Sequence, residues 1–308
     1  MDNYRLLPNW PHLPGDLKLG NPTGIGIDSN QNIFVFHRAD RKWSSGDAMP
    51  ETCILSDTIL LLDKDNGEIL NSWGGGFFIM PHGLTVDRNN DIWVTDVGSH
   101  QVFKFSPEGK LLLQLGEAKV PGNDPAHFNF PTDVAVAEDC SLYVSDGYGN
   151  SRVMKFSSVG KYLFEWGKKG NKAGEFNLPH AIDLDDEENV YIADRENCRV
   201  QVFTPTGKFI KEWADKSFGR ISSVAFNRSK KGFIAVDYAT SSSDIVLGSH
   251  IILFDSSGHL ITKLATKDGI GCWYHNILVD DQGYIYVTDI LGNSIQKFEK
   301  ISGPLLAP

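Results

Sequence analysis

The sequence predicts an all-β protein, and three observations make a six-bladed β-propeller the specific expectation. A short apolar strand recurs six times, at intervals of 42 to 59 residues, and most copies end near an acidic residue. Each copy is followed by a polar turn and a second strand rich in Val, Ile, Phe and Tyr. Most copies continue into a third and a fourth strand, separated by turns that contain Gly. Short strands of this composition form four-stranded antiparallel blades.

The six first strands share their length and their apolar character. They read GIGID (24–28), GLTVD (83–87), DVAVA (133–137), AIDLD (181–185), SVAFN (223–227) and NILVD (276–280). The second strands that pair with them read NIFVFHR, DIWVTDV, SLYVSDG, NVYIADR, GFIAVDY and YIYVTDI. Because the repeats run through the whole chain, we expect residues 1–308 to form one propeller domain.

The two ends of the chain predict how the ring closes. The last unit stops at SIQKFEK (294–300) without a clear fourth strand, while YRLLPNW (4–10) precedes the first unit and has no blade of its own. We therefore expect the N-terminal segment to supply the outer strand of the sixth blade. Such a closure would lock the ring, since it joins both termini in one sheet.

Composition and charge exclude several classes of protein. The net charge of −10 and the pI near 5.3 give no basic face for nucleic acid or for an anionic membrane surface. No apolar run approaches the roughly 18 to 20 residues that span a bilayer. We therefore expect a protein without nucleic-acid or membrane partners, and we expect it to be a monomer.

The first residues and the cysteines bear on the cellular compartment. The start of the chain has no basic region followed by an apolar stretch, which predicts a cytoplasmic protein; a secreted protein trimmed of its signal would look the same. The cysteines Cys53, Cys140, Cys198 and Cys272 lack CxxC spacing. We expect four reduced thiols and no thiol-based metal site.

One position in each repeat predicts a metal site. Five residues before the end of each first strand, the six repeats carry in order Thr23, His82, Thr132, His180, Ser222 and His275. Histidine therefore alternates with a small hydroxyl residue, and a six-bladed ring would place the three imidazoles about 120° apart around its axis. A single histidine at such a place is usually a structural hydrogen-bonding residue. Three in alternating blades predict a shared metal ion, preferably Zn²⁺ with an open fourth position.

The ends of the second strands should lie on the same face as the histidines. An acidic residue recurs there in blades with and without a histidine, as in Asp96, Asp146, Asp194 and Asp289, while His37 takes that place in the first blade. Because the repeated Asp does not follow the histidines, we interpret it as a blade-building residue whose carboxylate accepts backbone N–H groups.

The residues just beyond these positions predict a substrate site. Arg38 and Arg195 follow directly in the first and fourth blades, and Tyr148 stands close by in the third. An arginine at a surface is usually part of an ion pair, and a tyrosine can be core packing. Beside a metal, however, two guanidiniums offer forked donors for a substrate carboxylate, and a phenol can act as a base. Long connections at 39–57, 116–131 and 167–179 would either cover this face or be merely mobile.

Together these segments resemble a known family. FHRADRKW, MPHGLTVD, HQVFKF, FPTDVAVA, VSDGYGNSR, LPHAIDLD and ADRENCRVQVF, in this order from about residue 20 to residue 298, resemble the catalytic core of the peptidyl-α-hydroxyglycine α-amidating lyases, which are NHL-repeat propellers. The resemblance implies zinc ligation by His82, His180 and His275, and it places Arg38, Tyr148 and Arg195 in the substrate site.

The resemblance also implies a reaction, cleavage of a peptidyl-α-hydroxyglycine into a peptide amide and glyoxylate. Tyr148 would take the hydroxyl proton, and Arg38 and Arg195 would hold the carboxylate and the developing charge. Three alternatives remain. Ureidoglycolate is a related carbinolamide that would fit the same groups. A non-catalytic propeller could bind a peptide or protein on this face, and a lactonase-like hydrolase would use a calcium site lined by carboxylates and amides.

The chain departs from the family pattern at a few positions. The half-cystines of the animal enzymes are replaced by Asn129 with Gly149 and by Tyr191 with Val202. The family's structural Ca²⁺ would lie between the backbone carbonyls of Ile25 and Leu84 and the side chain of Asn276, where the family has a carboxylate. Losing that carboxylate should weaken Ca²⁺ binding. Finally, Tyr274 replaces the proline that precedes the third histidine.

Overall fold

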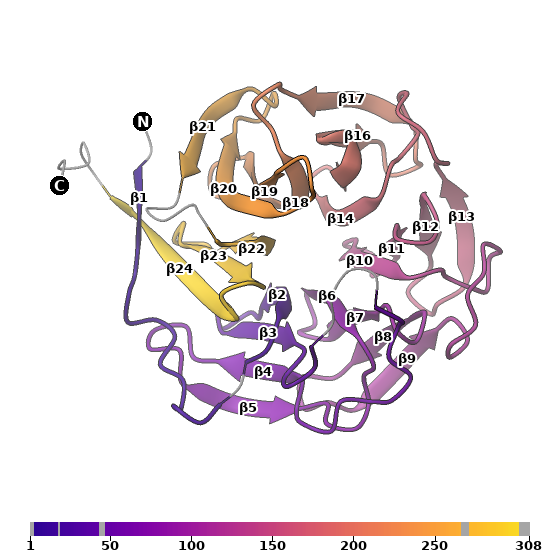
Figure 1. Ribbon diagram of the computed structural model, residues 1–308. Coiled ribbons are helices and arrows are strands. Elements are labelled where there is room, and N and C mark those ends of the chain that lie inside the picture. Colours follow the sequence, from indigo (N-terminus) through magenta and orange to yellow (C-terminus); the bar gives the residue numbers. More distant parts are fainter. Residues whose placement is uncertain (1–2, 18, 43–46, 266–270, 302–308) are drawn as a thin grey trace.

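A computed structural model describes the chain except residues 1–2, 18, 43–46, 266–270 and 302–308. The described residues form 24 β-strands and one turn of 3₁₀-helix, η1 (Arg195–Asn197), without an α-helix. The strands make six separate four-stranded antiparallel sheets arranged as a ring (Figure 1). The predicted six-bladed all-β propeller is therefore confirmed.

The first five blades each consist of four consecutive strands that follow one another from the axis outward. Blade 1 comprises β2 (Pro22–Ile27), β3 (Ile33–His37), β4 (Ile59–Leu62) and β5 (Ile69–Trp73). Blade 2 comprises β6 (Pro81–Val86), β7 (Ile92–Asp96), β8 (Gln101–Phe105) and β9 (Leu111–Leu115). Blade 3 comprises β10 (Pro131–Val136), β11 (Leu142–Asp146), β12 (Arg152–Phe156) and β13 (Tyr162–Trp166). Blade 4 comprises β14 (Pro179–Leu184), β15 (Val190–Asp194), β16 (Arg199–Phe203) and β17 (Phe209–Ala214). Blade 5 comprises β18 (Arg220–Asn227), β19 (Gly232–Thr240), β20 (Val246–Phe254) and β21 (Leu260–Ala265).

Blade 6 joins the two ends of the chain. Its strands β22 (Tyr274–Val279), β23 (Ile285–Asp289) and β24 (Ser294–Ile301) are completed by β1 (Asn3–Leu6), which pairs antiparallel with β24. The segment after β1 also packs on this blade, because the buried Trp10 ring lies edge-on to Tyr286 with the ring centroids 5.1 Å apart. The predicted closure of the ring by the N-terminal strand is confirmed.

The apolar core lies between neighbouring blades and not on the axis. Six buried clusters each combine side chains of two adjacent sheets; one, for example, joins Phe36 of blade 1 to Phe103 of blade 2. Inner strands approach closely where a side chain is missing, since a Cβ on Gly24 would lie 2.7 Å from the Cβ of Leu84. Burial of each large apolar side chain contributes about 1.5–3 kcal/mol. The core thus fixes the angles between blades and leaves the axis to polar groups.

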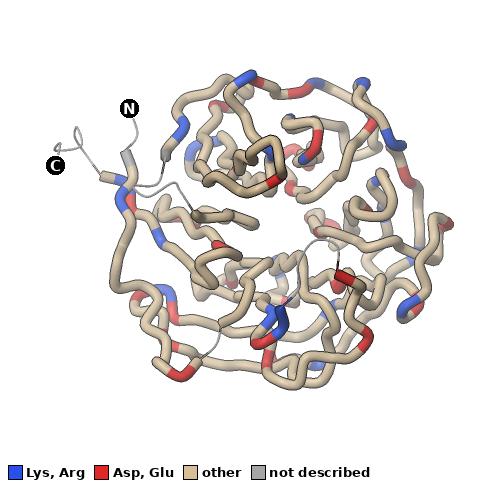
Figure 2. Tube along the Cα trace, viewed as in Figure 1, with Lys and Arg blue, Asp and Glu red and all other residues tan. Residues whose placement is uncertain are grey.

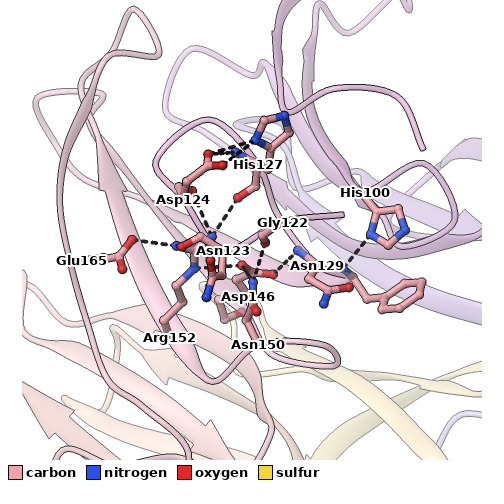
Figure 3. A network of polar contacts seen from close by, with 12 residues as sticks. His100, Gly122, Asn123, Asp124, His127, Asn129, Asp146, Asn150, Arg152 and Glu165 are labelled. Carbon is pink, nitrogen blue, oxygen red and sulfur yellow. Dashed lines mark hydrogen bonds and ion pairs between the residues drawn. The ribbon is translucent and has the colours of Figure 1, made fainter. Parts of the chain in front are cut away.

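The Asp that recurs at the end of the second strand in most blades holds loops in place, as predicted for a blade-building residue. In blade 3, Asp146 accepts hydrogen bonds from the N–H of Asn129 at 2.9 Å and from Arg152 Nε at 3.0 Å (Figure 3). The Arg152 guanidinium in turn donates to the carbonyls of Asn123, Asp124 and His127 at 2.6–3.2 Å. The loop that precedes β10 is therefore clamped to its blade by buried hydrogen bonds.

Blade 4 repeats this clamp around Arg199. Its Nε lies 2.8 Å from Asp194 Oδ2, and its remaining nitrogens donate to the carbonyls of Asn171, Lys172 and Glu175 at 2.9–3.0 Å. Both long loops that lead into blades 3 and 4 are thus fixed at the face where the inner strands begin. Basic and acidic residues are interspersed around the described parts of the ring (Figure 2).

Candidate metal centre and substrate site

A β-bulge lies at the same position of every inner strand. The pairing of each first strand with its second strand shifts around Thr23, His82, Thr132, His180, Ser222 and His275. A bulge redirects the side chain of the extra residue. Here each blade contributes one residue at an equivalent position near the axis, and all six residues are buried.

The three histidines come together on the axis. Their ring centroids are 4.7–4.9 Å apart, and one ligand nitrogen from each lies within 4.8 Å of the others. Among the described residues, they form the one group of His, Cys, Asp or Glu side chains able to hold a metal ion. Three imidazoles with an open fourth position match the donor set of catalytic zinc.

Backbone carbonyls of the hydroxyl residues orient the three rings. The Nδ1–H of His82 donates to the carbonyl of Thr132 at 2.6 Å, His180 to Ser222 at 2.6 Å and His275 to Thr23 at 2.7 Å. Each bond crosses to the following blade, so the pattern closes around the ring. Because Nδ1 carries the proton, each Nε2 keeps its lone pair, as metal ligation requires.

The two threonine hydroxyls add further hydrogen bonds to this ring. Thr23 Oγ1 donates to the carbonyl of Pro81 at 3.1 Å, and Thr132 Oγ1 donates to the carbonyl of Pro179 at 2.8 Å. Each of these prolines directly precedes a histidine. The alternation of histidine and hydroxyl residue seen in the sequence therefore has a structural reason. The backbone carbonyl of each hydroxyl residue accepts a hydrogen bond from the histidine of the preceding blade. The side chains of the two threonines also donate to the carbonyl that precedes the histidine of the following blade.

The surroundings keep the imidazoles uncharged. Burial, helped by the charge of Arg38, lowers the pKa of His275 from 6.5 to about 3. Burial also lowers the pKa of His82 and of His180 well below 6.5, with further contributions from neighbouring histidines and arginines. Neutral imidazole is the form that binds a metal ion. The donor chemistry of the site therefore fits zinc.

Tyr148 reaches the triad because of the glycine before it. Gly147 follows the capping Asp of blade 3, and a Cβ at this position would lie 2.0 Å from the carbonyl oxygen of Pro179. The close approach brings the Tyr148 hydroxyl to 3.0 Å from Nε2 of both His82 and His180. The Tyr148 side chain is 39% exposed and is thus accessible from the face of the ring.

Arg195 lies against Tyr148 from blade 4. It begins η1, which ends at Cys198 in the left-handed region (φ 51°). Its Nη1 is 3.4 Å from the Tyr148 hydroxyl, and its guanidinium carbon lies 5.4 Å from the centre of the Tyr148 ring. Burial disfavours the charge of Arg195, but Tyr148, Tyr238 and Glu196 outweigh it and raise the pKa of Arg195 above its usual value. A guanidinium so placed can bind a carboxylate.

Arg38 approaches from blade 1 and is almost fully buried. Its Nε donates to the carbonyl of Pro81 at 3.1 Å, one residue before the predicted ligand His82. Burial lowers the pKa of Arg38 to about 10, although Tyr148 and Asp96 favour its charge, so the guanidinium stays charged at neutral pH. Tyr148 and the two predicted arginines therefore surround the triad from three different blades.

Strained backbone leads into the site at two places. Phe130 and Leu178 have φ angles of 58° and 70° and stand two residues before Thr132 and His180. A positive φ is costly for a large side chain and persists only where the surroundings fix it. At Phe130 the surroundings include His100, whose Nδ1 accepts the Phe130 N–H at 3.0 Å.

The predicted calcium ligands lie on adjacent inner strands. Ile25 and Leu84 are buried on β2 and β6, and Asn276 is buried on β22, which also contacts β2. Two peptide carbonyls and an amide oxygen form a neutral donor set. Ca²⁺ prefers carboxylate oxygens and six to eight ligands, so these residues fit a calcium ion poorly.

The departures from the family pattern are accommodated locally. Tyr274 donates its N–H to Ser249 Oγ at 2.9 Å, a group that a proline would lack, and its own hydroxyl donates to Gln296 at 2.8 Å. The bulge and the Nδ1 bond of His275 remain. The tyrosine therefore does not distort the third ligand.

The positions of the missing half-cystines are neighbours in pairs. Tyr191 is paired with Val202 across β15 and β16, and the N–H of Gly149 donates to the carbonyl of Asn129 at 2.9 Å. The four cysteines of the chain are free, as predicted.

Sequence reasoning overlooked some residues around the site. Asp237 of blade 5 caps its strand as the other Asp residues do, and Tyr238 occupies the place of Arg38 and Arg195. The β18–β19 hairpin is one residue longer than its counterparts, so counting at fixed spacing missed both. Allowing a one-residue insertion would have found them. Gly147 and Glu196 gave no signal in the sequence.

A separate pocket of about 480 Å³ lies over blade 1, between the N-terminal segment and the outer strands. His37, Asp40 and Asp57 are among the residues that line it. The ligand histidines, Tyr148 and both arginines lie outside its lining. The triad instead lies buried on the axis of the ring, where Tyr148 contacts it.

Fold and site together define a class, a six-bladed propeller of the NHL type with three histidines on its axis. The family model described as NHL repeat matches residues 78–105 and 176–203, which include His82 and His180. The chain is 36% identical over 314 residues to peptidylglycine alpha-amidating monooxygenase of Rattus norvegicus, covering 94% of this chain and 31% of that protein.

Two shorter relatives are lyases by name. The chain is 33% identical over 321 residues to peptidyl-alpha-hydroxyglycine alpha-amidating lyase 1 of Drosophila melanogaster, covering 94% of this chain and 58% of that protein. It is 40% identical over 198 residues to a probable peptidyl-alpha-hydroxyglycine alpha-amidating lyase of Caenorhabditis elegans, covering 61% of this chain and 56% of that protein. The chain is thus similar to peptidyl-α-hydroxyglycine α-amidating lyases over most of its length, and it spans between about a third and just over half of the length of these three relatives.

Solved structures support the fold alone. A virginiamycin B lyase from Staphylococcus aureus superposes with a TM-score of 0.60 at 15% identity, covering 99% of this chain and 90% of that one. A gluconolactonase from Xanthomonas campestris superposes with a TM-score of 0.64 at 12% identity, covering 92% and 88%. In the described part of the chain, no helix has the length and apolar character needed to cross a membrane.

Proposed function

We propose that this protein is a zinc-dependent lyase that cleaves the C–N bond of an N-acyl-α-hydroxyglycine and releases an amide and glyoxylate. The observation that carries the proposal is the convergence of three neutral imidazoles, one phenol and two guanidiniums at the mouth of the ring. A binding scaffold has no need for such a set. The names of the amidating relatives support the same reaction.

His82, His180 and His275 would hold the zinc ion. When bound, zinc supplies Lewis acidity that makes the α-hydroxyl of the substrate easier to deprotonate. The residues already provide what this requires, since each Nδ1–H is bonded to a carbonyl and each Nε2 therefore carries the lone pair that a metal would bind.

Tyr148 is the proposed base. Its oxygen lies 3.0 Å from two ligand nitrogens and 3.4 Å from Arg195 Nη1, which would stabilise negative charge on that oxygen. The reaction is redox-neutral: the hydroxyl proton leaves, a C=O bond forms, the C–N bond breaks, and the departing nitrogen gains one proton. Tyr148 acts at the first of these events.

Arg38 and Arg195 are the proposed carboxylate ligands. Only Nε of Arg38 donates to another described residue, so its two outer nitrogens remain for substrate. Charged, forked donors bind carboxylates strongly and in a fixed orientation. They would hold the substrate with its α-carbon over the triad, because they approach the triad from blades 1 and 4.

Metal analysis and a glyoxylate-release assay with N-benzoyl-α-hydroxyglycine test the proposal. We expect about one zinc per chain, lost in His180→Ala and kept in His259→Ala, an exposed histidine of blade 5 that serves as the control. Tyr148→Phe should keep the metal and lose most of the rate. Zinc without glyoxylate release would refute the reaction, and unchanged zinc in His180→Ala would refute the ligand assignment.

We further infer that the chain forms one domain, works as a monomer and resides in a reducing compartment, for which the cytoplasm is the natural candidate. The four free cysteines and the replaced half-cystine positions support the compartment. A calcium ion at Ile25, Leu84 and Asn276 would bind weakly, because the donors carry no charge.

A further inference from the structure

A chain of ion pairs leads from the site into blade 5. Arg195 Nε lies 2.9 Å from Glu196 Oε1, and Glu196 Oε2 lies 2.9 Å from Nε of Arg220. Arg220 Nη2 lies 3.0 Å from Asp244 Oδ1 on the β19–β20 hairpin. One carboxylate thus divides its two oxygens between two arginines of neighbouring blades.

The backbone brings the first two members together. Consecutive residues do not face each other on a regular helix. In η1 the Glu196 N–H donates to the carbonyl of Asn177 at 3.1 Å, and the Cys198 N–H donates to the carbonyl of Arg195 at 3.1 Å. This tight turn lets Glu196 bond the Nε edge of Arg195, so that the outer nitrogens of Arg195 point to Tyr148.

The charges of these ion-paired side chains determine how strongly Arg195 can attract a substrate carboxylate. If Arg195 were paired with Glu196 alone, the net charge of the pair would be zero. The side chains of Arg195 and Glu196 are only 13% and 22% exposed, so solvent screens this pair weakly. Arg220 is the second cation on the same carboxylate, so Arg195, Glu196 and Arg220 together carry a net charge of +1. Asp244 brings the sum of all four side chains to zero, but it is 75% exposed, so solvent screens its charge far more than that of Glu196.

Resting on the proposed function, we infer that Glu196 and Arg220 are positioning residues for Arg195. Glu196 fixes the orientation of the Arg195 guanidinium. Arg220 balances the charge of Glu196, so that Arg195 keeps its charge for the substrate carboxylate. The opposing interpretation is that Glu196 and Arg220 only join blade 4 to blade 5. The two interpretations differ in what they predict for ligands with and without a carboxylate.

The experiment measures binding of hippurate and of its neutral amide to the zinc-loaded full chain by calorimetry. Hippurate resembles the substrate but lacks the hydroxyl, so it binds without turnover. We expect Arg220→Met to weaken hippurate binding roughly tenfold and to leave the amide within about twofold. In Arg220→Met/Glu196→Gln the uncompensated negative charge is gone, so hippurate binding should return towards the wild-type value.

A matched control removes another ion pair between the same blades. Arg228 Nη1 lies 2.8 Å from Asp186 Oδ1. These two residues follow the C-terminal ends of β18 and β14, whereas Arg220 begins β18. Arg228→Met should leave both ligands unchanged. If Arg220→Met weakens hippurate and amide equally, if the double variant stays weak, or if Arg228→Met has the same effect, the inference is wrong.

Further measurements distinguish a failure of this inference from misfolding of a variant and from failure of the proposed lyase reaction. Thermal denaturation and zinc content are measured first, and if Arg220→Met does not fold, Arg220→Lys takes its place. Arg220→Lys keeps the charge and must bind hippurate within about threefold of wild type; a larger loss overturns the inference. A wild-type protein that binds hippurate but releases no glyoxylate refutes the lyase reaction and leaves this inference standing. A wild-type protein that does not bind hippurate overturns it.

Discussion

Gly147 is the position where one added methyl group should separate the phenol of Tyr148, the proposed base, from the histidine triad. A Cβ on this residue would lie 2.0 Å from the Pro179 carbonyl oxygen and 2.9 Å from its carbonyl carbon. Carbon and oxygen normally approach to about 3.3 Å. The two segments must therefore separate by more than an ångström in Gly147→Ala. The φ angle of Gly147 lies outside the left-handed region, so the expected effect is steric and not conformational.

The displacement falls directly on the site. Pro179 precedes the ligand His180, and its carbonyl also accepts the Thr132 hydroxyl at 2.8 Å. Tyr148 follows Gly147, so a shift of either segment separates the phenol from His180. A misplacement of about 1 Å in a catalytic group lowers the rate about a hundredfold, or by about 2.7 kcal/mol in transition-state stabilisation.

The assay is kcat/KM for glyoxylate release, measured with zinc content and thermal denaturation. We expect Gly147→Ala to bind zinc less tightly and to lose about two orders of magnitude in kcat/KM. Gly15→Ala is the control, because a Cβ there meets no atom within 4 Å. A Gly147→Ala protein that keeps kcat/KM within threefold of wild type, with unchanged zinc content, would show that the close approach does not position Tyr148.

Three further perturbations have outcomes that follow from the structure. Without metal, the free energy of unfolding should fall as the pH drops from 6.5 towards 3, because His275 is protonated below pH 6.5 in the unfolded chain but only near its lowered pKa of about 3 in the folded protein. Denaturation at several pH values after chelation checks this. If His275→Gln leaves the dependence of the unfolding free energy on pH unchanged, the prediction is wrong. Arg152→Met should cost about 3–5 kcal/mol of unfolding free energy, because it leaves the buried Asp146 carboxylate unpaired and frees the loop before β10; limited proteolysis should then cut that loop, and exposed Arg88→Met should not change it. Removing residues 1–12 deletes β1 from blade 6 and should lower the melting temperature by about 10 °C or more; a ring that melts as the intact chain does would show that closure adds little.

The fold could be read from the sequence because a propeller repeats one simple pattern. Each blade needs alternating strands and Gly-containing turns, and both are local signals. The closing strand was predictable for a different reason: a blade with three strands and a segment without a blade complete each other. No long-range information was needed beyond the number of repeats.

The candidate site could be predicted only as far as symmetry determines it. Equal spacing placed His82, His180 and His275 on one axis, and the structure brings their nitrogens within 4.8 Å. Spacing could not reveal the bulges, because a bulge depends on pairing with the second strand. It also missed Tyr238, since one extra residue in a hairpin shifts every later position.

Tyr274 replaces the proline that precedes the third histidine in the family pattern, and packing compensates for this replacement. A proline before a ligand offers a fixed φ and no N–H, so replacing it leaves a donor to be satisfied. Ser249 on the neighbouring blade accepts that N–H from Tyr274, and Gln296 accepts the new hydroxyl. The sequence could not show this compensation, since both partners come from other strands.

The symmetric part of the site and the asymmetric part do different work. The ring of backbone carbonyls is threefold, and it directs three equivalent Nε2 lone pairs to one point. A threefold centre has no preferred direction for a substrate. Direction comes from positions whose residue differs from blade to blade: Tyr148 of blade 3 contacts His82 and His180, and the two arginines stand only in blades 1 and 4. On the proposed function, a substrate with one hydroxyl and one carboxylate would satisfy a bound metal, the phenol and the guanidiniums together only in one orientation. For that reason the departures from repeat symmetry, more than the repeat itself, should determine which substrate the propeller cleaves.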